Sequence, residues 1–347
     1  METSGSAQTA TRKGPAMHTQ TELECAYMPV RDELAQVEKE LRKSVSKDFG
    51  TVSDALVYLL GSEGKRVRPA VLILVAKACG LNGSGRGVQM ATAAELFHTA
   101  TLVTDDILDA AVIRRGQKTV NQKWGTDTAV LSAQYLYLSA LSISSRIKSN
   151  GDVSDYSRVI LDTANSMLSG EIKDIETGKS DRLLTEQEYI SMVRDKTASL
   201  FSACSRIGAL LADAEPRVLK AMLVYGENLG IAFQIADDVL DITADENLLG
   251  KSLGTDLRMG RMTLPLIHHL RVSDRKTRRT FVESLASGKG ELASLRFSLE
   301  RSGSIDYSLN RARQYASAAR KSLDILGESA YKKSLEALSR YAVQREM

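Results

Sequence analysis

Residue types that mark several protein classes are scarce in this chain of 347 residues. The three cysteines, Cys25, Cys79 and Cys204, lie far apart and form no CxxC pair, so neither a disulfide framework nor a zinc site is expected. Apolar runs of 18 or more residues are missing, so no transmembrane segment is expected. The formal net charge of +3 is too small to indicate a nucleic-acid partner. Any charge-based function must therefore lie in local patches.

Proline, which interrupts helices, occurs only five times. Apolar residues recur at helical spacing in many segments, as Leu34, Val37 and Leu41 do. Residues 91–109 contain neither proline nor glycine, which predicts a mostly buried helix. Alternating strand patterns are few and short, and no internal repeat is present. We therefore predict an all-α chain.

A second long helix is expected from Val218 to Ile242. It contains Gly226 and Gly230, which we expect to let two helix backbones approach closely. Loops are expected at residues 80–87, 149–155, 178–184, 244–261 and 287–290. The coarse prediction is one domain built around long central helices.

The start of the chain differs in composition from the rest. Residues 1–20 are rich in Ser, Thr, Ala and Gly, lack an apolar signal-peptide core, and are expected to form a disordered tail. Residues 21–347 are expected to form the single domain, although Met17 could also serve as the start. The cysteine usage fits a reducing compartment, so we expect a cytoplasmic protein.

Two acidic motifs carry the strongest chemical signal. TDDILD places Asp105 and Asp109 four residues apart, and IADDVLD repeats the DDxxD pattern with Asp237, Asp238 and Asp241. On a helix, residues four apart share a face and lie about 6 Å apart along the axis. Clustered carboxylates beside apolar residues are costly without a counter-charge, and a hard divalent cation such as Mg²⁺ supplies one.

The alternative for either motif is a solvated acidic helix face. Two copies in apolar contexts, about 130 residues apart, make this alternative less favoured. Basic segments flank the first motif: Lys65, Arg66 and Arg68 precede it, and Arg114 and Arg115 follow it. Guanidinium groups match phosphate oxygens. The basic and acidic segments together indicate two anionic ligands, one of which is held without metal.

The order GKRVRP, HTATLVTDDILD, RRG, KTASLF, FQIADDVLD, GKSLGTDL and TLPL resembles the trans-isoprenyl diphosphate synthases over roughly residues 30–345. The resemblance implies the isoprenoid synthase fold, an antiparallel helix bundle around a deep apolar cavity, and a homodimer. It implies isopentenyl diphosphate and allylic diphosphates as substrates and Mg²⁺ as cofactor. It also allows a loose association with membranes through the product.

The resemblance also assigns roles to individual residues. Direct Mg²⁺ ligands are Asp105, Asp109 and Asp237, with Asp238 and Asp241 completing the second motif. The isopentenyl diphosphate site comprises Lys65, Arg68, His98 and Arg115. The allylic diphosphate is held by Arg114, Lys196, Thr197, Gln234 and Lys251, of which Lys196, Arg114 and Lys251 are catalytic. Thr104, Asp174 and Arg261 depart from the residues that are common in the family at these positions.

The implied activity is that of a trans-prenyltransferase. One alternative is a class I terpene cyclase, but a cyclase needs no second diphosphate site and usually carries a different second metal motif. Another alternative is a non-catalytic subunit of a heteromeric synthase, but such subunits usually lose the acidic motifs that this chain keeps.

The resemblance also relates product length to the residues before the first acidic motif. Thr101 lies one turn before Asp105, and Ala100 is its neighbour. Both are small, whereas short-chain members of the family tend to carry an aromatic residue at one of these positions. We therefore expect a hexaprenyl to decaprenyl product, with geranylgeranyl diphosphate as the alternative. One turn deeper, Phe97 is interpreted either as a core residue or as a partial floor.

Overall fold

The computed structural model describes most of the chain. The described residues are 22–45, 48–62, 64–147, 154–178, 182–243, 261–286 and 292–344. The predicted N-terminal tail and the predicted loop at 287–290 lie outside them, as does nearly all of the loop expected at 244–261.

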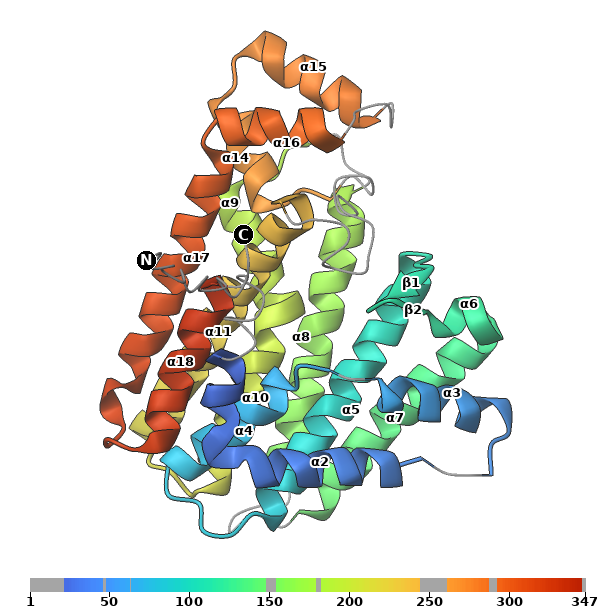
Figure 1. Cartoon of the computed structure of the whole chain (residues 1–347), viewed down its shortest axis with the longest axis vertical. Helices are drawn as coiled ribbons and strands as arrows, with labels where there is room; N and C mark the ends of the chain where they lie inside the picture. The colour runs from blue at the N-terminus through green and yellow to red at the C-terminus, as the bar shows by residue number, and fades with distance from the viewer. Residues whose placement is uncertain are drawn as a thin grey trace, which may run out of the picture.

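Helices dominate the described residues (Figure 1). The first half contains η1 (Met28–Val30), α2 (Arg31–Lys43), α3 (Thr51–Gly61), α4 (Val67–Ala78), α5 (Gly85–Leu108), α6 (Val120–Trp124), α7 (Thr126–Arg146) and α8 (Ser154–Gly178). The second half contains α9 (Glu186–Val193), the π-helix η2 (Arg194–Ala198), α10 (Ser199–Leu211), α11 (Pro216–Thr243), α14 (Leu264–Val272), α15 (Arg275–Ala286), α16 (Leu292–Arg301), α17 (Ser304–Ser322), η3 (Leu323–Ile325) and α18 (Ala330–Gln344).

The expected helices are present. The helix predicted for residues 91–109 is α5, and the helix predicted from Val218 to Ile242 is α11. The loop predicted for residues 80–87 ends too late, because α5 already begins at Gly85. The first turn of a helix has N–H groups without intrahelical partners, so glycines cost less there than in the helix interior. The all-α prediction is confirmed.

Strand structure in the described residues is limited to one hairpin between α5 and α6. β1 (Ile113–Arg114) pairs with β2 (Gln117–Lys118) in antiparallel register, with Ile113 opposite Lys118. The turn uses Arg115 and Gly116, both with positive φ. The hairpin therefore places the two arginines of the RRG segment directly beyond the end of α5.

Long helices form the centre of the bundle, where α5, α8, α10 and α11 lie side by side (Figure 1). α4 packs on α10, α7 packs on α5, and α17 covers α11. α4 and α5 are buried along most of their length, which explains the largely apolar sequence of α4, whereas α5 also buries polar residues such as Thr92, Glu95 and Asp106. Apart from the residues left undescribed, no helix combines the length and apolar character needed to cross a membrane.

Close helix contacts depend on glycine, as expected for α11. A Cβ atom at Gly226 would lie 2.4 Å from the carbonyl oxygen of Phe201. A Cβ atom at Gly230 would lie 2.5 Å from the Cα atom of Ala198. Real Cβ atoms do not approach other atoms so closely, so any side chain here would push α11 away from η2 and α10. This close approach fixes the second acidic motif relative to Lys196 and Thr197.

Candidate active site

The first acidic motif lies at the C-terminal end of α5. Asp105 is in the last turn, and Asp109 follows the helix as its cap residue, with its N–H donating to the Asp105 carbonyl over 2.8 Å. Burial raises the pKa of Asp105 to about 6, and nearby Lys196 opposes the rise. Asp106 is buried and accepts a hydrogen bond of 2.6 Å from Arg114 Nε. The motif is therefore partly dehydrated, and its charge requires cationic neighbours.

Lys196 supplies one of these positive charges. Its ammonium group donates to Asp174 over 2.6 Å and pairs with Glu171 over 2.7 Å. Burial opposes the charged form, but the two carboxylates together raise the pKa of Lys196. A Cβ atom at Gly170 would lie 2.5 Å from the Lys196 backbone nitrogen, so α8 approaches η2 closely here. Glycine at position 170 thus allows α8 to bring both carboxylates to Lys196.

Arg261 supplies a second positive charge. Its Nη2 bonds to Asp109, and its Nε lies 3.7 Å from Asp174. Two of the three positions that are expected to depart from the common family pattern, Asp174 and Arg261, therefore lie within ion-pair distance of each other. We call Asp105, Asp109, Glu171 and Asp174, with Lys196 and Arg261 between them, the acidic cluster.

The second acidic motif lies near the C-terminal end of α11. Asp237 is exposed, whereas Asp238 and Asp241 are buried. Asp238 accepts a hydrogen bond of 2.5 Å from the Tyr189 hydroxyl and another of 2.7 Å from Gln234 Nε2. Both oxygens of Asp238 therefore bond to the protein.

The π-helix η2 connects the two motifs. Lys196 reaches the acidic cluster, and the adjacent Thr197 donates from its hydroxyl to Gln234 Oε1 over 2.8 Å. A π-helix is rare and is often found at functional sites, because its extra residue changes the direction of the side chains. Here two consecutive residues face the α8 carboxylates and α11, respectively.

The donor set fits a hard divalent cation, although no complete metal site is assembled. Among the described residues, no group of three or more His, Cys, Asp or Glu side chains is arranged to hold a metal ion. Asp105 and Asp109 nevertheless provide partly buried carboxylate oxygens, which hard cations such as Mg²⁺ prefer. Burial raises the pKa of Asp105, so a cation bound beside it would favour its charged form.

A separate group of cationic side chains lies between α4, α5 and the hairpin. Arg68 Nη1 donates to His98 Nε2 over 3.0 Å, and the Arg68 guanidinium stacks over the Phe201 ring at 4.5 Å. A guanidinium can only donate, so His98 Nε2 must accept and the neutral imidazole carries its hydrogen on Nδ1. Burial lowers the pKa of His98 well below 6.5, and the positive charges of Arg68 and Arg115 lower it further. His98 is therefore neutral at physiological pH.

Two donor positions in this group lack partners within the described structure. The buried Arg68 Nε and His98 Nδ1 atoms have no hydrogen-bond partner there. Unpaired buried donors are costly, and an anion with several oxygens would satisfy them. We call Arg68, His98 and Arg115 the basic cluster.

Arg115 joins the basic cluster through its backbone conformation. It has φ of 51°, a left-handed conformation that non-glycine residues adopt at some cost. A Cβ atom at Gly64 would lie 3.0 Å from Arg115 Nη1, so the Gly64–Lys65 segment and the RRG turn meet here. Lys65 is exposed, with its ammonium 5.7 Å from the Tyr341 ring centroid.

The third arginine of this region is used structurally. Arg66 pairs with Glu38 and, over 2.8 Å, with the buried Glu95. Glu95 also acts on Arg68 and Arg115, because its charge favours the protonated form of both. A single buried carboxylate therefore offsets the mutual repulsion of three arginines.

Most of the predicted residues fall into these two clusters or beside them. The acidic cluster contains Asp105, Asp109 and Lys196, and the basic cluster contains Arg68, His98 and Arg115. Lys251 lies outside the described residues. The sequence did not single out Glu95, Glu171 or Tyr189. For Tyr189 a signal existed, because Thr185 and Glu188 form the capping box that starts α9 and fixes its position.

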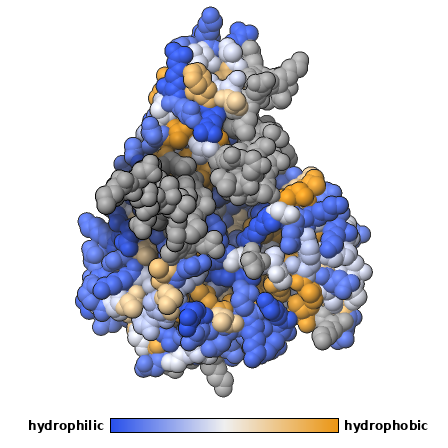
Figure 2. Space-filling model, viewed as in Figure 1, coloured by the Kyte–Doolittle hydropathy of each residue, from blue (hydrophilic) through white to orange (hydrophobic). Residues whose placement is uncertain are grey.

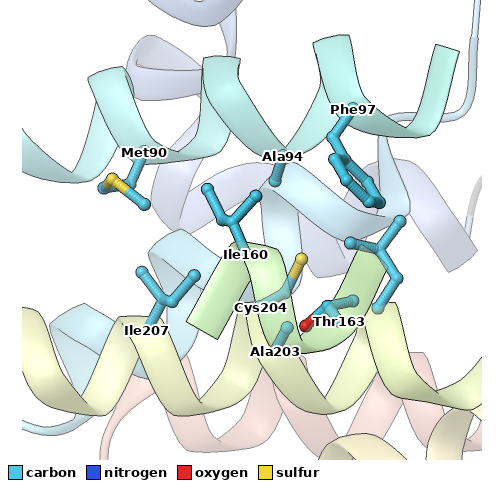
Figure 3. A pocket seen from close by; sticks show the side chains of 9 residues that line it. Met90, Ala94, Phe97, Ile160, Thr163, Ala203, Cys204 and Ile207 are labelled. Atoms are coloured by element: carbon cyan, nitrogen blue, oxygen red, sulfur yellow. The ribbon is translucent and has the colours of Figure 1, made fainter. Parts of the chain in front are cut away.

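The chain-length candidates lie below Asp105 on α5. Ala100 is fully buried, and Thr101 is 9% exposed and donates its hydroxyl to its own helix at the His98 carbonyl. Phe97 is 3% exposed and packs edge-on against Tyr137, with ring centroids 5.2 Å apart. Phe97 also lines an internal cavity (Figure 3), and both interpretations of this residue stay predictions.

The polyprenyl synthetase family model matches residues 50–300. An octaprenyl diphosphate synthase from Haemophilus influenzae is 31% identical over 90% of this chain and 94% of its own length. A geranylgeranyl diphosphate synthase from Methanosarcina mazei is 38% identical over 83% of this chain and 88% of its own length.

A solved structure of the same family has a similar fold. The crystal structure of a polyprenyl synthase from Caulobacter crescentus, complexed with calcium and isoprenyl diphosphate, has a TM-score of 0.86 and 27% identity. The alignment covers 93% of this chain and 98% of that protein. The likeness therefore extends over nearly the whole length of both chains.

Proposed function

The chain belongs to the polyprenyl synthetase family and is a prenyltransferase, and we propose that it condenses isopentenyl diphosphate with an allylic diphosphate into an all-trans polyprenyl diphosphate. The observation that carries this proposal is the pairing of two clusters of opposite character. Carboxylates prevail in the acidic cluster, whereas the basic cluster consists of cations and a neutral histidine. The two clusters can each hold one diphosphate substrate, because a carboxylate-lined site binds an anion through a metal ion, whereas a cationic site binds an anion directly.

The acidic cluster is proposed to hold the allylic diphosphate. Asp105, Asp109 and Asp237 are the proposed Mg²⁺ ligands, with Asp238 and Asp241 as members of the second motif. When bound, Mg²⁺ neutralises charge on the diphosphate and makes it a better leaving group. Lys196 and Arg114 act from the protein side, because their fixed positive charges stabilise charge that develops on the leaving oxygen. Lys251 is proposed for the same role from its sequence position.

Gln234 and Thr197 have a positioning role in this proposal. Their mutual hydrogen bond ties η2 to α11, and Gln234 also donates to Asp238. These bonds hold Lys196 and the second acidic motif in a fixed relation before substrate arrives. Such preorganisation avoids reorganisation during the reaction.

The basic cluster is proposed to hold isopentenyl diphosphate together with Lys65. Arg68 and Arg115 contribute guanidinium donors, and His98 contributes its Nδ1 hydrogen. Isopentenyl diphosphate held there attacks the allylic carbon through its double bond and then loses a proton. The departing diphosphate is the proposed acceptor of that proton. The apolar residues below Asp105 exclude water, which would otherwise capture the allylic cation.

The test of this function uses the purified protein, radiolabelled isopentenyl diphosphate, Mg²⁺ and one allylic starter at a time. We expect acid-labile, organic-extractable products whose formation stops when the metal is chelated. If no starter yields a prenyl product although the protein is folded, the proposal is wrong.

Product length is a finer part of the proposal. The small residues Ala100 and Thr101 support a product longer than farnesyl diphosphate. The sequence-based proposal is hexaprenyl to decaprenyl, with geranylgeranyl as the alternative. Chromatography of the dephosphorylated products distinguishes them, and Ala100→Phe should shorten the product by filling the first turn below Asp105. If Ala100→Phe gives the same product lengths as the wild-type enzyme, the α5 surface near Ala100 does not set product length.

We further propose that the enzyme is a cytoplasmic homodimer. Large apolar side chains are exposed at helical spacing on α7, at Leu131 and Leu138, and on α8, at Leu161, Leu168 and Ile172. Figure 2 shows hydrophobic side chains gathered over α3 and α7. Exposed apolar surface of this extent supports a protein interface, and two-fold symmetry allows one surface to cover itself.

The oligomer proposal is tested by light scattering. Leu138→Asp and Leu168→Asp should shift the protein from dimer to monomer. Phe297→Asp is the matched control, because Phe297 is also exposed, at 61%, but lies on α16, away from α7 and α8. A dimer that persists in both variants would contradict this interface.

A further inference from the structure

A buried tyrosine outside both clusters contacts the second acidic motif. Tyr189 lies on α9, is 1% exposed, and belongs to an apolar cluster that includes Ile190 and Ile235. Its hydroxyl donates to Asp238 Oδ2 over 2.5 Å, a short bond of the kind that an ionised acceptor forms. The ring of Tyr189 therefore provides packing, whereas its hydroxyl reaches a carboxylate of the motif.

Two further features fix the position of α9. A capping box closes its first turn. Glu186 accepts hydrogen bonds from the Tyr307 hydroxyl over 2.5 Å and from Arg311 Nε over 2.7 Å, and both donors lie on α17. Because α17 also packs on α11, the place of Tyr189 relative to the second acidic motif is determined by the protein itself.

Asp238 joins Tyr189 to a longer chain of hydrogen bonds. Asp238 Oδ1 accepts from Gln234 Nε2 over 2.7 Å, and Gln234 Oε1 accepts from the Thr197 hydroxyl over 2.8 Å. Tyr189 and Thr197 both lie on the continuous segment formed by α9 and η2. This segment is thus attached to α11 at two points through one chain of hydrogen bonds.

The direction of each bond in this chain follows from the chemistry of its groups. An ionised carboxylate can only accept, so Tyr189 and the Gln234 amide nitrogen both donate to Asp238. The Gln234 amide oxygen then faces Thr197, whose hydroxyl is the donor. Without the tyrosine hydroxyl, the Asp238 carboxylate can rotate toward other donors, and the Gln234 amide loses a fixed acceptor.

The spacing of α11 connects this chain to the proposed metal ligand. Four side chains share one side of the helix, because they lie three or four positions apart: Gln234, Asp237, Asp238 and Asp241. Groups that orient metal ligands without touching the ion commonly contribute about 10- to 100-fold to metal affinity. Tyr189 has such a place, since it contacts the carboxylate adjacent to Asp237.

We propose that Tyr189 is a positioning residue, which orients the second acidic motif through Asp238 and thereby raises the affinity for the divalent cations that accompany the diphosphate. The inference rests on the proposed function, but cation binding can be measured without turnover. It makes α9 part of the machinery of the acidic motifs. It also accounts for a hydroxyl within an apolar cluster, where an unpaired polar group would be costly.

The test compares Tyr189→Phe with the wild-type protein. The substitution removes the hydroxyl and keeps the ring, so the packing is preserved. Mn²⁺ is the probe for the cation site, and the loss of its free electron paramagnetic resonance signal measures binding in the presence of inorganic diphosphate. We expect the Kd for Mn²⁺, and the Mg²⁺ concentration at half-maximal turnover, to rise about 10-fold. The KM for isopentenyl diphosphate should stay constant, because the basic cluster is intact.

Tyr225→Phe is the matched control. Tyr225 lies on α11, is fully buried, and donates its hydroxyl to the Leu335 carbonyl over 2.9 Å, so the same atom is removed from an equally buried site. Because Tyr225 lies about 18 Å along the helix from Asp237, its loss should leave the Kd for Mn²⁺ unchanged. A double-mutant cycle then tests the route, since Tyr189→Phe should have little further effect in an Asp238→Asn background.

The outcomes separate the possible failures. The proposal is wrong if Tyr189→Phe binds Mn²⁺ as the wild-type protein does, if the wild-type protein binds none, or if the effect of Tyr189→Phe persists in full beside Asp238→Asn. If the wild-type protein binds Mn²⁺ but makes no prenyl product, the proposed function fails, and the cation titration still decides the role of Tyr189. Should Tyr189→Phe fail to fold, Glu186→Gln weakens the attachment of α9 to α17 and should raise the same Kd by a smaller factor. An unchanged Kd in Glu186→Gln would then contradict the proposal.

Discussion

The acidic and basic clusters are built in opposite ways. The acidic cluster rests on the close approach of regular helices, in which Gly170 lets α8 contact η2 and Gly230 lets α11 contact the same π-helix. The basic cluster rests on turns, with Arg66 and Arg115 in left-handed conformations. In the acidic cluster, Asp109 and Asp174 are paired with nearby cations, whereas the basic cluster leaves donors unpaired in the described structure. One site is thus suited to a metal-bound anion and the other to direct contact with an anion.

The largest expected effect comes from removing a carboxylate that has no substitute. Asp105→Ala or Asp237→Ala should lower kcat by about a thousandfold or more, because metal contacts are worth several kcal/mol in the transition state. The affinity for isopentenyl diphosphate should change little, since the basic cluster is intact. Steady-state kinetics and calorimetry measure the two effects. Asp54→Ala, at an exposed site, is the control, and wild-type turnover in either active-site variant would refute the metal assignment.

A smaller effect is expected in the basic cluster. Arg115→Ala should raise the apparent KM for isopentenyl diphosphate by about 10- to 100-fold, because hydrogen bonds to charged groups contribute about 1.5–3 kcal/mol. The KM for the allylic substrate should stay nearly constant, which separates the two clusters. Arg115→Lys keeps the charge and should recover part of the affinity. An equal rise in KM for both substrates would show that the two clusters do not bind their substrates independently.

The counter-charge of the basic cluster should matter for stability. Glu95→Gln keeps a hydrogen-bonding group beside Arg66 but removes the negative charge that Arg66, Arg68 and Arg115 share. We expect the free energy of unfolding to fall by about 1–3 kcal/mol, as measured by denaturant titration. Glu38→Gln is the matched control. The Glu38 side chain is 34% exposed, so removing its charge should lower the free energy of unfolding by less. An equal fall in the free energy of unfolding for both variants would contradict the role of Glu95 as the shared counter-charge of the three arginines.

The smallest expected effect concerns His98. Proton NMR of the four histidines should show one titration well below pH 6.5 that disappears in His98→Gln. Below pH 6.5 the unfolded chain binds a proton that folded His98 does not, so unfolding becomes easier as pH falls. His98→Gln should lack this contribution to the pH dependence of stability. A titration at or above pH 6.5 would contradict the neutral tautomer inferred from Arg68.

The two clusters also differ in how far the sequence could predict them. Asp105 and Asp109 were placed on one face by helical spacing alone, and α5 and α11 appeared where their apolar patterns predicted them. The basic cluster was predicted as two separate segments, and only the family resemblance joined Arg68, His98 and Arg115. The structure brings them together through Gly64 and the RRG turn, whose positive φ angles have no periodic signal in the sequence.

The sequence by itself determined the all-α fold, the long central helices and the residues of both acidic motifs, because these depend on spacing within one helix. Tertiary structure decided which charges meet. Glu171 and Asp174 reach Lys196 from another helix, and Arg261 reaches Asp109 from a segment 152 residues away in sequence. It also placed Ile160 and Ile207 opposite Met90 in one cavity. Helical periodicity specifies the face on which a side chain lies, but the partner across that face depends on how whole helices pack.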